Sequence, residues 1–134
     1  VEEGGDLTEA RLKKKELGAI GEAASADMLE RQGFQLLARN WRCKTGEIDL
    51  IALDDEILVF IEVRTRSGSD VFGTPQEAVD VRKQRQIVET SRVYMHLERM
   101  NERQIRFDVV SVKTTPSGNV LQIDHIRNAF YPMA

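Results

Sequence analysis

The amino-acid sequence predicts an α/β protein built on one mixed β-sheet with a helix on each side. Two observations predict this class. Hydrophobic residues follow strand-like patterns in five short segments and helical spacing in two longer ones. The expected order is helix, three strands, helix and two strands, and a helix between two strands of one sheet favours a right-handed crossover. The rest of the chain is organised around the hairpin of the second and third strands.

Composition restricts the protein to a few classes. The 134 residues are 41% hydrophobic, which fits one compact domain over residues 1–134, with residues 1–6 expected to be disordered. The net charge of -3 argues against a protein that coats nucleic acid through bulk charge, although local basic patches can still bind a phosphate backbone. Cys43 is the single cysteine, so no intrachain disulfide can form, and no apolar run is long enough to span a membrane. We therefore expect a cytoplasmic protein with no membrane partner.

The first helix is expected to run from Asp6 to about residue 32. Asp6 and Glu9 have the spacing of a capping box, and Gly33 is a typical residue after a helix end. Glu22 falls to one side of the stripe that should face the core, among small residues that let another backbone come close. A lone glutamate on a helix is usually a surface charge, so its role depends on what it faces. The expected core stripe is Leu17, Ile20, Ala24 and Met28.

The strongest strand pattern lies over Gly46–Arg66, after a first strand over Phe34–Trp41. Successive side chains alternate across a sheet, so Glu62 and Arg64 should project from the same face of the third strand. Charged side chains in an otherwise apolar strand indicate that this face carries a site.

The register of the hairpin decides whether a second acid joins them. With Asp54 and Asp55 as a symmetric turn, Asp49 would lie opposite Phe60 and would share a face with Glu62. A shift of one residue would move Asp49 to the opposite face. We therefore predict that two carboxylates and a cation converge on one patch.

The remaining segments complete the sheet. Residues 66–73 are expected to form a loop, and Thr74 followed by Pro75 should open a second helix that ends near residues 99–102. The last two strands and the turn between them are expected at Ile105–Lys113, Val120–Ile126 and Thr115–Gly118.

The three acids Glu22, Asp49 and Glu62 suit a hard divalent cation. Mg²⁺ or Mn²⁺ prefers oxygen ligands and keeps waters that a substrate phosphate can displace. Such an ion generates hydroxide and neutralises charge that develops on a phosphate. The structural alternative is that Glu62 and Arg64 form an ordinary ion pair on an exposed strand.

Basic residues are expected to form a discontinuous rim around this acidic patch. Such a rim would position a nucleic-acid backbone without reading its bases. Clusters of this kind are most often solvated surface, but several of these residues lie close in sequence to the hairpin. The predicted rim is Arg39, Arg42, Lys44, Arg66, Arg82, Lys83 and Arg85.

Other polar residues give weaker signals. Asp108 lies among apolar residues, and we favour a structural role for it. His96 and His125 have no partner at a metal-ligand spacing, and both are interpreted as ordinary surface or satisfied residues.

Several short motifs between about Gly18 and Phe130 carry a resemblance to a known family. They are G-E-A-A at 21–24, N-W-R at 40–42, G-E-I-D-L-I at 46–51, F-I-E-V-R-T-R at 60–66, F-G-T-P at 72–75, R-F-D-V-V at 106–110 and N-A-F at 128–130. These motifs resemble the YraN-type family of uncharacterised bacterial proteins, which are regarded as predicted endonucleases related to archaeal Holliday junction resolvases. The order I-D, spacer, E-V-R also resembles the PD-(D/E)xK nuclease superfamily.

The resemblance implies a restriction endonuclease-like fold, with the order α-β-β-β-α-β-β in this chain. It maps metal ligands onto Asp49 and Glu62, an auxiliary acid onto Glu22 and a backbone carbonyl ligand onto Val63. The implied function is Mg²⁺- or Mn²⁺-dependent hydrolysis of phosphodiester bonds in DNA, in branched or single-stranded substrates. The oligomeric state stays open, a homodimer included.

The chain departs from the superfamily pattern at Arg64, where the motif has lysine. Arginine stays protonated and cannot act as a base, but it can hold a phosphate through two parallel hydrogen bonds. Lys83 on the following helix is a candidate to supply the missing amine, with a surface lysine as the ordinary interpretation. Two alternatives therefore remain beside the nuclease: a catalytically weak or inactive nucleic-acid-binding module, and a scaffold in which the acidic cluster is residual.

Overall fold

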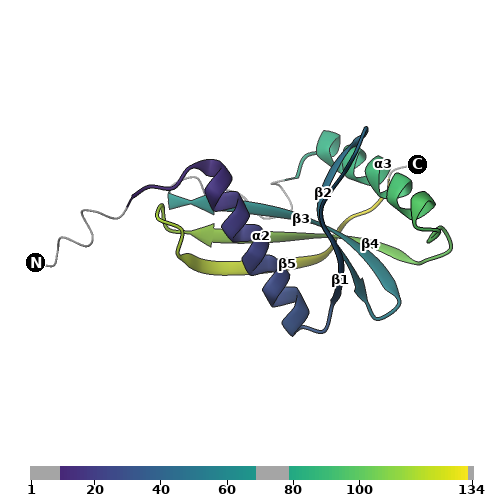
Figure 1. The fold of residues 1–134 in the computed structure, drawn as a ribbon, viewed down its shortest axis with the longest axis horizontal. Coiled ribbons are helices and arrows are strands. Elements are labelled where there is room, and N and C mark those ends of the chain that lie inside the picture. Colours follow the sequence, from purple (N-terminus) through teal and green to yellow (C-terminus); the bar gives the residue numbers. More distant parts are fainter. Residues whose placement is uncertain (1–9, 69–78, 133–134) are drawn as a thin grey trace, which may run out of the picture.

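A computed structural model describes residues 10–68 and 79–132 of the chain. In this part the elements are α2 (Lys14–Arg31), β1 (Gln35–Cys43), β2 (Gly46–Asp54), β3 (Ile57–Ser67), α3 (Val81–Leu97), β4 (Ile105–Thr114) and β5 (Val120–Phe130). The strands form one sheet in the order β1-β2-β3-β4-β5. All neighbouring strands are antiparallel except β3 and β4, which are parallel and are connected through α3. The predicted mixed sheet with two flanking helices is thus confirmed (Figure 1). No helix in the described ranges is long and apolar enough to cross a membrane.

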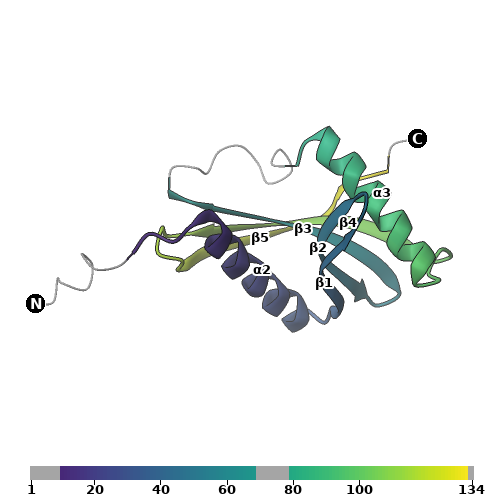
Figure 2. The ribbon, with the colours of Figure 1, turned by 45° about the horizontal axis from the view of Figure 1, so that its top comes forward.

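The two helices lie on opposite faces of the sheet (Figure 2). Alternate residues of β3 divide between two cores, because side chains alternate across the sheet. Phe60 packs on the α3 side with Ile87 and Tyr94, and Ile61 packs on the α2 side with Leu29.

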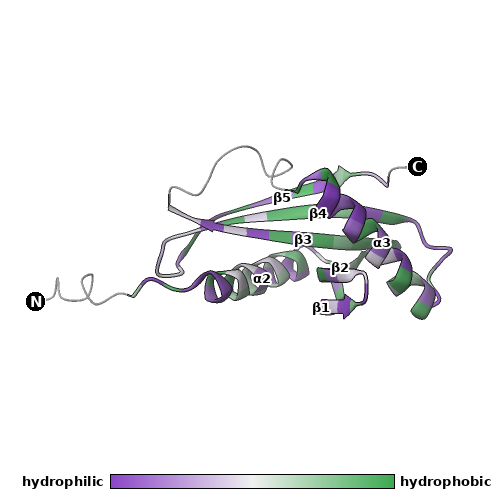
Figure 3. Ribbon diagram, turned by 90° about the horizontal axis from the view of Figure 1, so that it is seen from above, coloured by the Kyte–Doolittle hydropathy of each residue, from purple (hydrophilic) through white to green (hydrophobic). Residues whose placement is uncertain are grey.

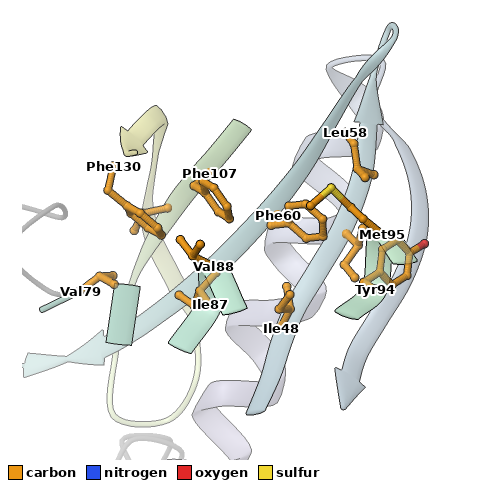
Figure 4. Close-up of a cluster of buried hydrophobic side chains, with 12 residues drawn as sticks. Ile48, Leu58, Phe60, Val79, Ile87, Val88, Tyr94, Met95, Phe107 and Phe130 are labelled. Carbon is orange, nitrogen blue, oxygen red and sulfur yellow. The ribbon is translucent and has the colours of Figure 1, made fainter. Parts of the chain in front are cut away.

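The α3-side core combines aliphatic side chains with the aromatic rings of Phe60, Tyr94, Phe107 and Phe130 (Figure 4). The Phe60 and Phe107 rings stack with centroids 5.7 Å apart, and the Phe107 and Phe130 rings with centroids 5.1 Å apart. These ring contacts hold β3, β4 and β5 together in the core. The polar end of β3 continues from this packed part of the sheet.

The β2–β3 register differs from the predicted one. Ile51, and not Asp49, lies opposite Phe60, and Asp54 pairs with Ile57. The turn is therefore formed by Asp55 and Glu56, and Asp55 has a φ of 54°, a left-handed conformation that aspartate tolerates better than most residues. The shift is two residues, so the predicted faces survive although the predicted turn is wrong.

Helix α2 begins later than predicted and buries a different stripe. The proposed cap at Asp6 and Glu9 lies outside the described residues, as does the expectation for residues 1–6, and residues 10–13 are not helical. The backbone N–H of Lys13 instead donates to Glu16 at 2.8 Å. The larger side chains predicted to form the core stripe are only half-buried, and the buried residues are Gly21, Ser25, Ala26 and Leu29.

The close approach of α2 to the sheet explains this difference. A Cβ atom at Gly21 would collide with the side chain of Thr65 on β3. The helix therefore contacts the sheet through its small residues, and the residue after Gly21 is Glu22. This packing sets the position of Glu22 relative to the sheet.

Helix α3 begins at Val81, where the Asp80 side chain accepts a hydrogen bond from the Lys83 N–H at 2.9 Å. The predicted helix start at Thr74 and Pro75 and most of the predicted loop lie outside the described residues. The helix ends at Leu97, shortly before the predicted end, and β5 continues to Phe130, beyond its predicted end.

Candidate active site

The candidate site lies where β2 and β3 separate. Their pairing ends at Leu50 and Ile61, and the next residue on each strand is an acid, Asp49 or Glu62. Beyond this point the Val63 N–H donates to Asp49 Oδ2 at 2.8 Å, so a side-chain carboxylate takes the place of a strand carbonyl. Asp49 is 9% exposed and Glu62 is 5% exposed. Two buried acids therefore sit side by side at the fork between the strands.

Burial and mutual repulsion perturb both acids. Burial raises the pKa of Glu62 to about 8, and the Asp49 charge adds to this effect against the opposing influence of Lys83 and Arg64. Burial also raises the pKa of Asp49, although the hydrogen bond from Val63 acts in the other direction. Two adjacent carboxylates in a buried position cannot both ionise easily without a compensating cation. The pair therefore favours a proton or a metal ion between its oxygens.

Glu22 approaches the pair from α2. Burial raises the pKa of Glu22 and the Asp49 charge raises it further, whereas a hydrogen bond from the Asn40 side chain lowers it. Asn40 lies on β1 and Val63, which donates to Asp49, lies on β3, so residues of α2, β1 and β3 meet around Asp49. The structure thus brings Glu22, Asp49 and Glu62 into one electrostatic neighbourhood.

Two cations from different elements face the same oxygen of Glu62. Arg64 Nη1 lies 3.8 Å from Glu62 Oε2, and Lys83 Nζ lies 3.9 Å from it. Both distances exceed hydrogen-bond length, and each cationic side chain is about a third exposed. Lys83 also lowers the pKa of Asp49, so its charge reaches both acids. These side chains are therefore placed to contact an anion that approaches the acids from solvent.

The acid pair fits a hard metal ion, but the predicted three-acid ligand set does not form. Among the described residues no three His, Cys, Asp or Glu side chains are arranged to hold a metal ion. Glu22 comes from α2 and interacts with both Asp49 and Asn40. The donors that fit Mg²⁺ or Mn²⁺ are the carboxylate oxygens of Asp49 and Glu62. The pKa values of both acids are raised, and a bound cation would lower them. Val63 contacts this pair through its N–H.

The predicted basic rim is spread over three elements. Arg39, Arg42 and Lys44 are exposed on and after β1, and Arg42 pairs with Glu47 at 3.3 Å. Arg66 on β3 is half-buried. Arg82 and Arg85 are exposed on α3, and Arg82 and Lys83 line an open pocket of about 400 Å³ with Asp80 and Gln86. Of these predicted rim residues, Lys83 has an ion pair to the acids, at 3.9 Å from Glu62 Oε2.

A second polar cluster lies on the α2 side of β4. Asp108 is fully buried and receives hydrogen bonds from Arg106 Nε at 2.8 Å and Arg106 Nη2 at 2.9 Å. His125 Nε2 lies 2.8 Å from Asp108 Oδ2, and the Asn128 N–H donates at 2.9 Å. Burial raises the pKa of Asp108, but these partners outweigh it, so the pKa lies below its ordinary value. This cluster ties β5 to β4, in agreement with the structural role predicted for Asp108. The partnership with His125 has no short-range sequence signal, because 17 residues separate the two.

Fold and site together define the class: a small mixed α/β protein with a buried acid pair at a strand fork and cations beside it. The family model described as "Uncharacterised protein family UPF0102" matches residues 21–112. The chain belongs to this family, which confirms the resemblance to YraN-type proteins.

Its relatives match nearly end to end. A UPF0102 protein of Caldanaerobacter subterraneus subsp. tengcongensis is 42% identical over 121 residues, covering 90% of this chain and 98% of the relative. UPF0102 proteins of Moorella thermoacetica and Geobacter metallireducens are each 44% identical over 119 residues, covering 89% of this chain and 98% and 95% of the relatives. None of these names states an activity.

Proposed function

We propose that this protein is a metal-dependent endonuclease that hydrolyses phosphodiester bonds in branched or single-stranded DNA. The observation that carries the proposal is the buried Asp49–Glu62 pair flanked by Arg64 and Lys83. Buried acids with raised pKa values are costly for stability and are frequent at functional sites. The order of helix, three strands, helix and parallel strand also resembles the restriction endonuclease-like core.

In this proposal Asp49 and Glu62 hold Mg²⁺ or Mn²⁺, together with the Val63 carbonyl that the family resemblance implies. The bound ion supplies an activated water and neutralises charge on the phosphate. The Val63 N–H holds the Asp49 carboxylate in one orientation. Glu22 adds negative charge beside Asp49 and so strengthens the attraction of the site for a cation.

Arg64 and Lys83 are assigned to the scissile phosphate. Each lies just beyond hydrogen-bond distance of Glu62 Oε2, so each can turn to a phosphate oxygen with little loss. Arg64 can bind two phosphate oxygens at once and cannot serve as a base. Lys83 adds a compact positive charge from α3, where the Asp80 cap holds its backbone. The pair would stabilise charge that develops as the phosphodiester bond breaks.

One observation favours a second candidate. Arg64 occupies the position where the superfamily has lysine, so the same site could bind nucleic acid and metal without cutting. In that case the protein would be a nucleic-acid-binding module of nuclease fold.

Calorimetric titration with Mg²⁺ and Mn²⁺ tests the shared premise of both candidates. Wild type should bind the ion, and Asp49→Asn should lose most of the affinity because one of two acid ligands is removed. Asp27→Asn is the matched control, since Asp27 is an exposed acid on α2 paired with Arg31. Cleavage by metal-bound wild type supports the nuclease, and metal-dependent DNA binding without cleavage supports the binding module. Wild type that binds neither metal nor DNA would contradict both.

A further inference from the structure

Two rows of polar residues continue across the sheet beyond the acid pair. Strands β3, β4 and β5 pair so that neighbouring residues project from the same face. Arg64 is paired with Ser111, which is paired with Asp124. The next row on this face is Arg66, Lys113 and Gln122. We call these six residues the distal ledge.

The distal ledge lies on the face opposite α2. Val63, Val112 and Ile123, each next to a ledge residue along its strand, pack into the α2-side core, so alternation turns the ledge residues the other way. The same face carries Phe60, Phe107 and Phe130 at its other end, where α3 side chains cover them. Strands β3, β4 and β5 extend past α3 at the end that holds the ledge (Figures 1 and 2). The ledge therefore continues the site's own surface away from α3.

The composition of the distal ledge selects the class of partner. It carries three cations and one acid, and Asp124 accepts a hydrogen bond from Gln122 Nε2 at 2.8 Å. Lys113, Gln122 and Asp124 are exposed, and Ser111 is half-buried. This end of β3 is hydrophilic, whereas its middle is hydrophobic (Figure 3). A positive, hydrogen-bonding strip without large apolar side chains fits a phosphate backbone and does not fit a hydrophobic protein surface.

We propose that the distal ledge binds the phosphate backbone of the nucleic-acid strand that enters the acid site. This inference rests on the proposed function. It gives the bound strand a path over the surface, which runs from the acid pair along β3 towards Ser67 and crosses β4 at Lys113. Arg64 is then the shared residue, because it faces Glu62 at 3.8 Å and begins the ledge. Lys113 is the residue that the basic pattern in the sequence did not identify. It acts as a phosphate contact 49 positions away from Arg64 in the chain and one strand away in the sheet.

The test is DNA binding by Lys113→Glu and Lys113→Gln, measured by fluorescence anisotropy with a labelled single strand between about 50 and 200 mM salt. Lys15→Glu is the control, because Lys15 is exposed on α2 and its change in net charge is the same. We expect Lys113→Glu to weaken binding about tenfold at the low-salt end and to reduce the salt slope by about 1, the effect of one lost phosphate contact. Lys113→Gln should show a smaller loss in the same direction, and Lys15→Glu should match wild type.

The outcomes separate this inference from the proposed function. Wild-type binding that is unchanged in both Lys113 variants overturns the ledge and leaves the nuclease proposal intact. Binding that depends on Lys113 in a protein without metal affinity supports the ledge and contradicts the nuclease. Association with phosphatidylglycerol vesicles in place of DNA, or self-association that Lys113→Glu abolishes, overturns the ledge as a nucleic-acid surface. Thermal unfolding of each variant verifies that the exposed substitutions leave the fold intact.

Discussion

Glu62 combines three constraints in one carboxyl group: burial, a neighbouring acid and two flanking cations. Its pKa of about 8, against an ordinary value of 4.5, means that the folded state holds a proton that the unfolded state releases between these pH values. The free energy of unfolding should therefore fall as the pH rises through this window, since the folded state binds more protons. The acid pair is thus a cost to stability that a bound cation would relieve.

Glu62→Gln should remove this pH dependence, because glutamine imitates the protonated acid. At pH 8 the variant should be more stable than wild type by on the order of a few kcal/mol, and the difference should shrink towards pH 5. Thermal unfolding against pH measures it, with exposed Glu30→Gln as control. If the free energy of unfolding of wild type rose from pH 5 to 8 relative to that of Glu62→Gln, the assignment of the proton to Glu62 would be contradicted.

Arg64 gives the second residue-scale prediction. Lys83 already places an amine 3.9 Å from Glu62, so Arg64 is expected to act as a phosphate clamp. Arg64→Lys should then lower the single-turnover cleavage rate about tenfold, because a point charge cannot reproduce a bidentate contact. Lys83→Met should lower it as well. An increase in rate with Arg64→Lys would mean that the chain lacks the amine that the superfamily uses at this position.

At the scale of elements, the contact between α2 and β3 controls where Glu22 lies. Gly21→Ala should destabilise the protein by about 1–3 kcal/mol, since the added Cβ collides with the β-branched Thr65. Gly18→Ala is a sharp control, because a Cβ there meets nothing within 4 Å and alanine favours helix by about 0.5–1 kcal/mol. Opposite shifts in the thermal unfolding midpoint are expected. Equal shifts would show that the α2–β3 contact is looser than described.

The same contact shows what the sequence can predict at this scale. Alternation in β3 correctly separated Phe60, Glu62 and Arg64 from Ile61, because period-2 patterning depends only on local geometry. The stripe of α2 was mispredicted, because the buried face is set by how closely a helix approaches a strand. A pattern of hydrophobic residues favours large side chains, whereas this interface selects Gly21, Ser25 and Ala26.

For the hairpin, Asp49 and Glu62 are adjacent as predicted, although the predicted turn at Asp54 and Asp55 is wrong. A turn at Asp55 and Glu56 requires a positive φ at Asp55, which the sequence alone does not distinguish from a turn one residue earlier. The predicted proximity of Asp49 and Glu62 held because the error was an even number of residues. An odd error would have placed the two acids on opposite faces. The ligand trio was overpredicted for a related reason: parity gives a shared face, but not the separations that a three-acid cluster requires.

At the scale of the whole molecule, the two faces of the sheet carry charges of different kinds. Asp108 on the α2 side is hydrogen-bonded by Arg106, His125 and Asn128 at 2.8–2.9 Å, whereas the cations that face Glu62 on the α3 side lie 3.8 and 3.9 Å away. The first arrangement lowers the pKa of Asp108, whereas burial and the neighbouring Asp49 raise the pKa of Glu62. The molecule thus separates a structural acid from a candidate functional one.

Asp108→Asn tests this separation. Removing the charge weakens the two hydrogen bonds from Arg106, although Asp54 stays as a second counterion at 2.9 Å. We therefore expect a loss of about 1–3 kcal/mol in the free energy of unfolding. Metal affinity at temperatures where the variant is folded should stay at the wild-type value. Denaturant unfolding and calorimetric metal titration measure the two quantities. A loss of metal binding with unchanged stability would exchange the roles assigned to the two acids.

In the proposed nuclease, the acid pair at the strand fork is the catalytic centre. Single-turnover cleavage of a branched DNA substrate in Mg²⁺, by wild type and Glu62→Ala purified in parallel, tests this role. Wild type should cleave slowly but measurably, and Glu62→Ala should fall to the background rate, while Glu30→Ala retains wild-type activity. Cleavage that survives Glu62→Ala would place the activity elsewhere and would contradict a catalytic role for the acid pair.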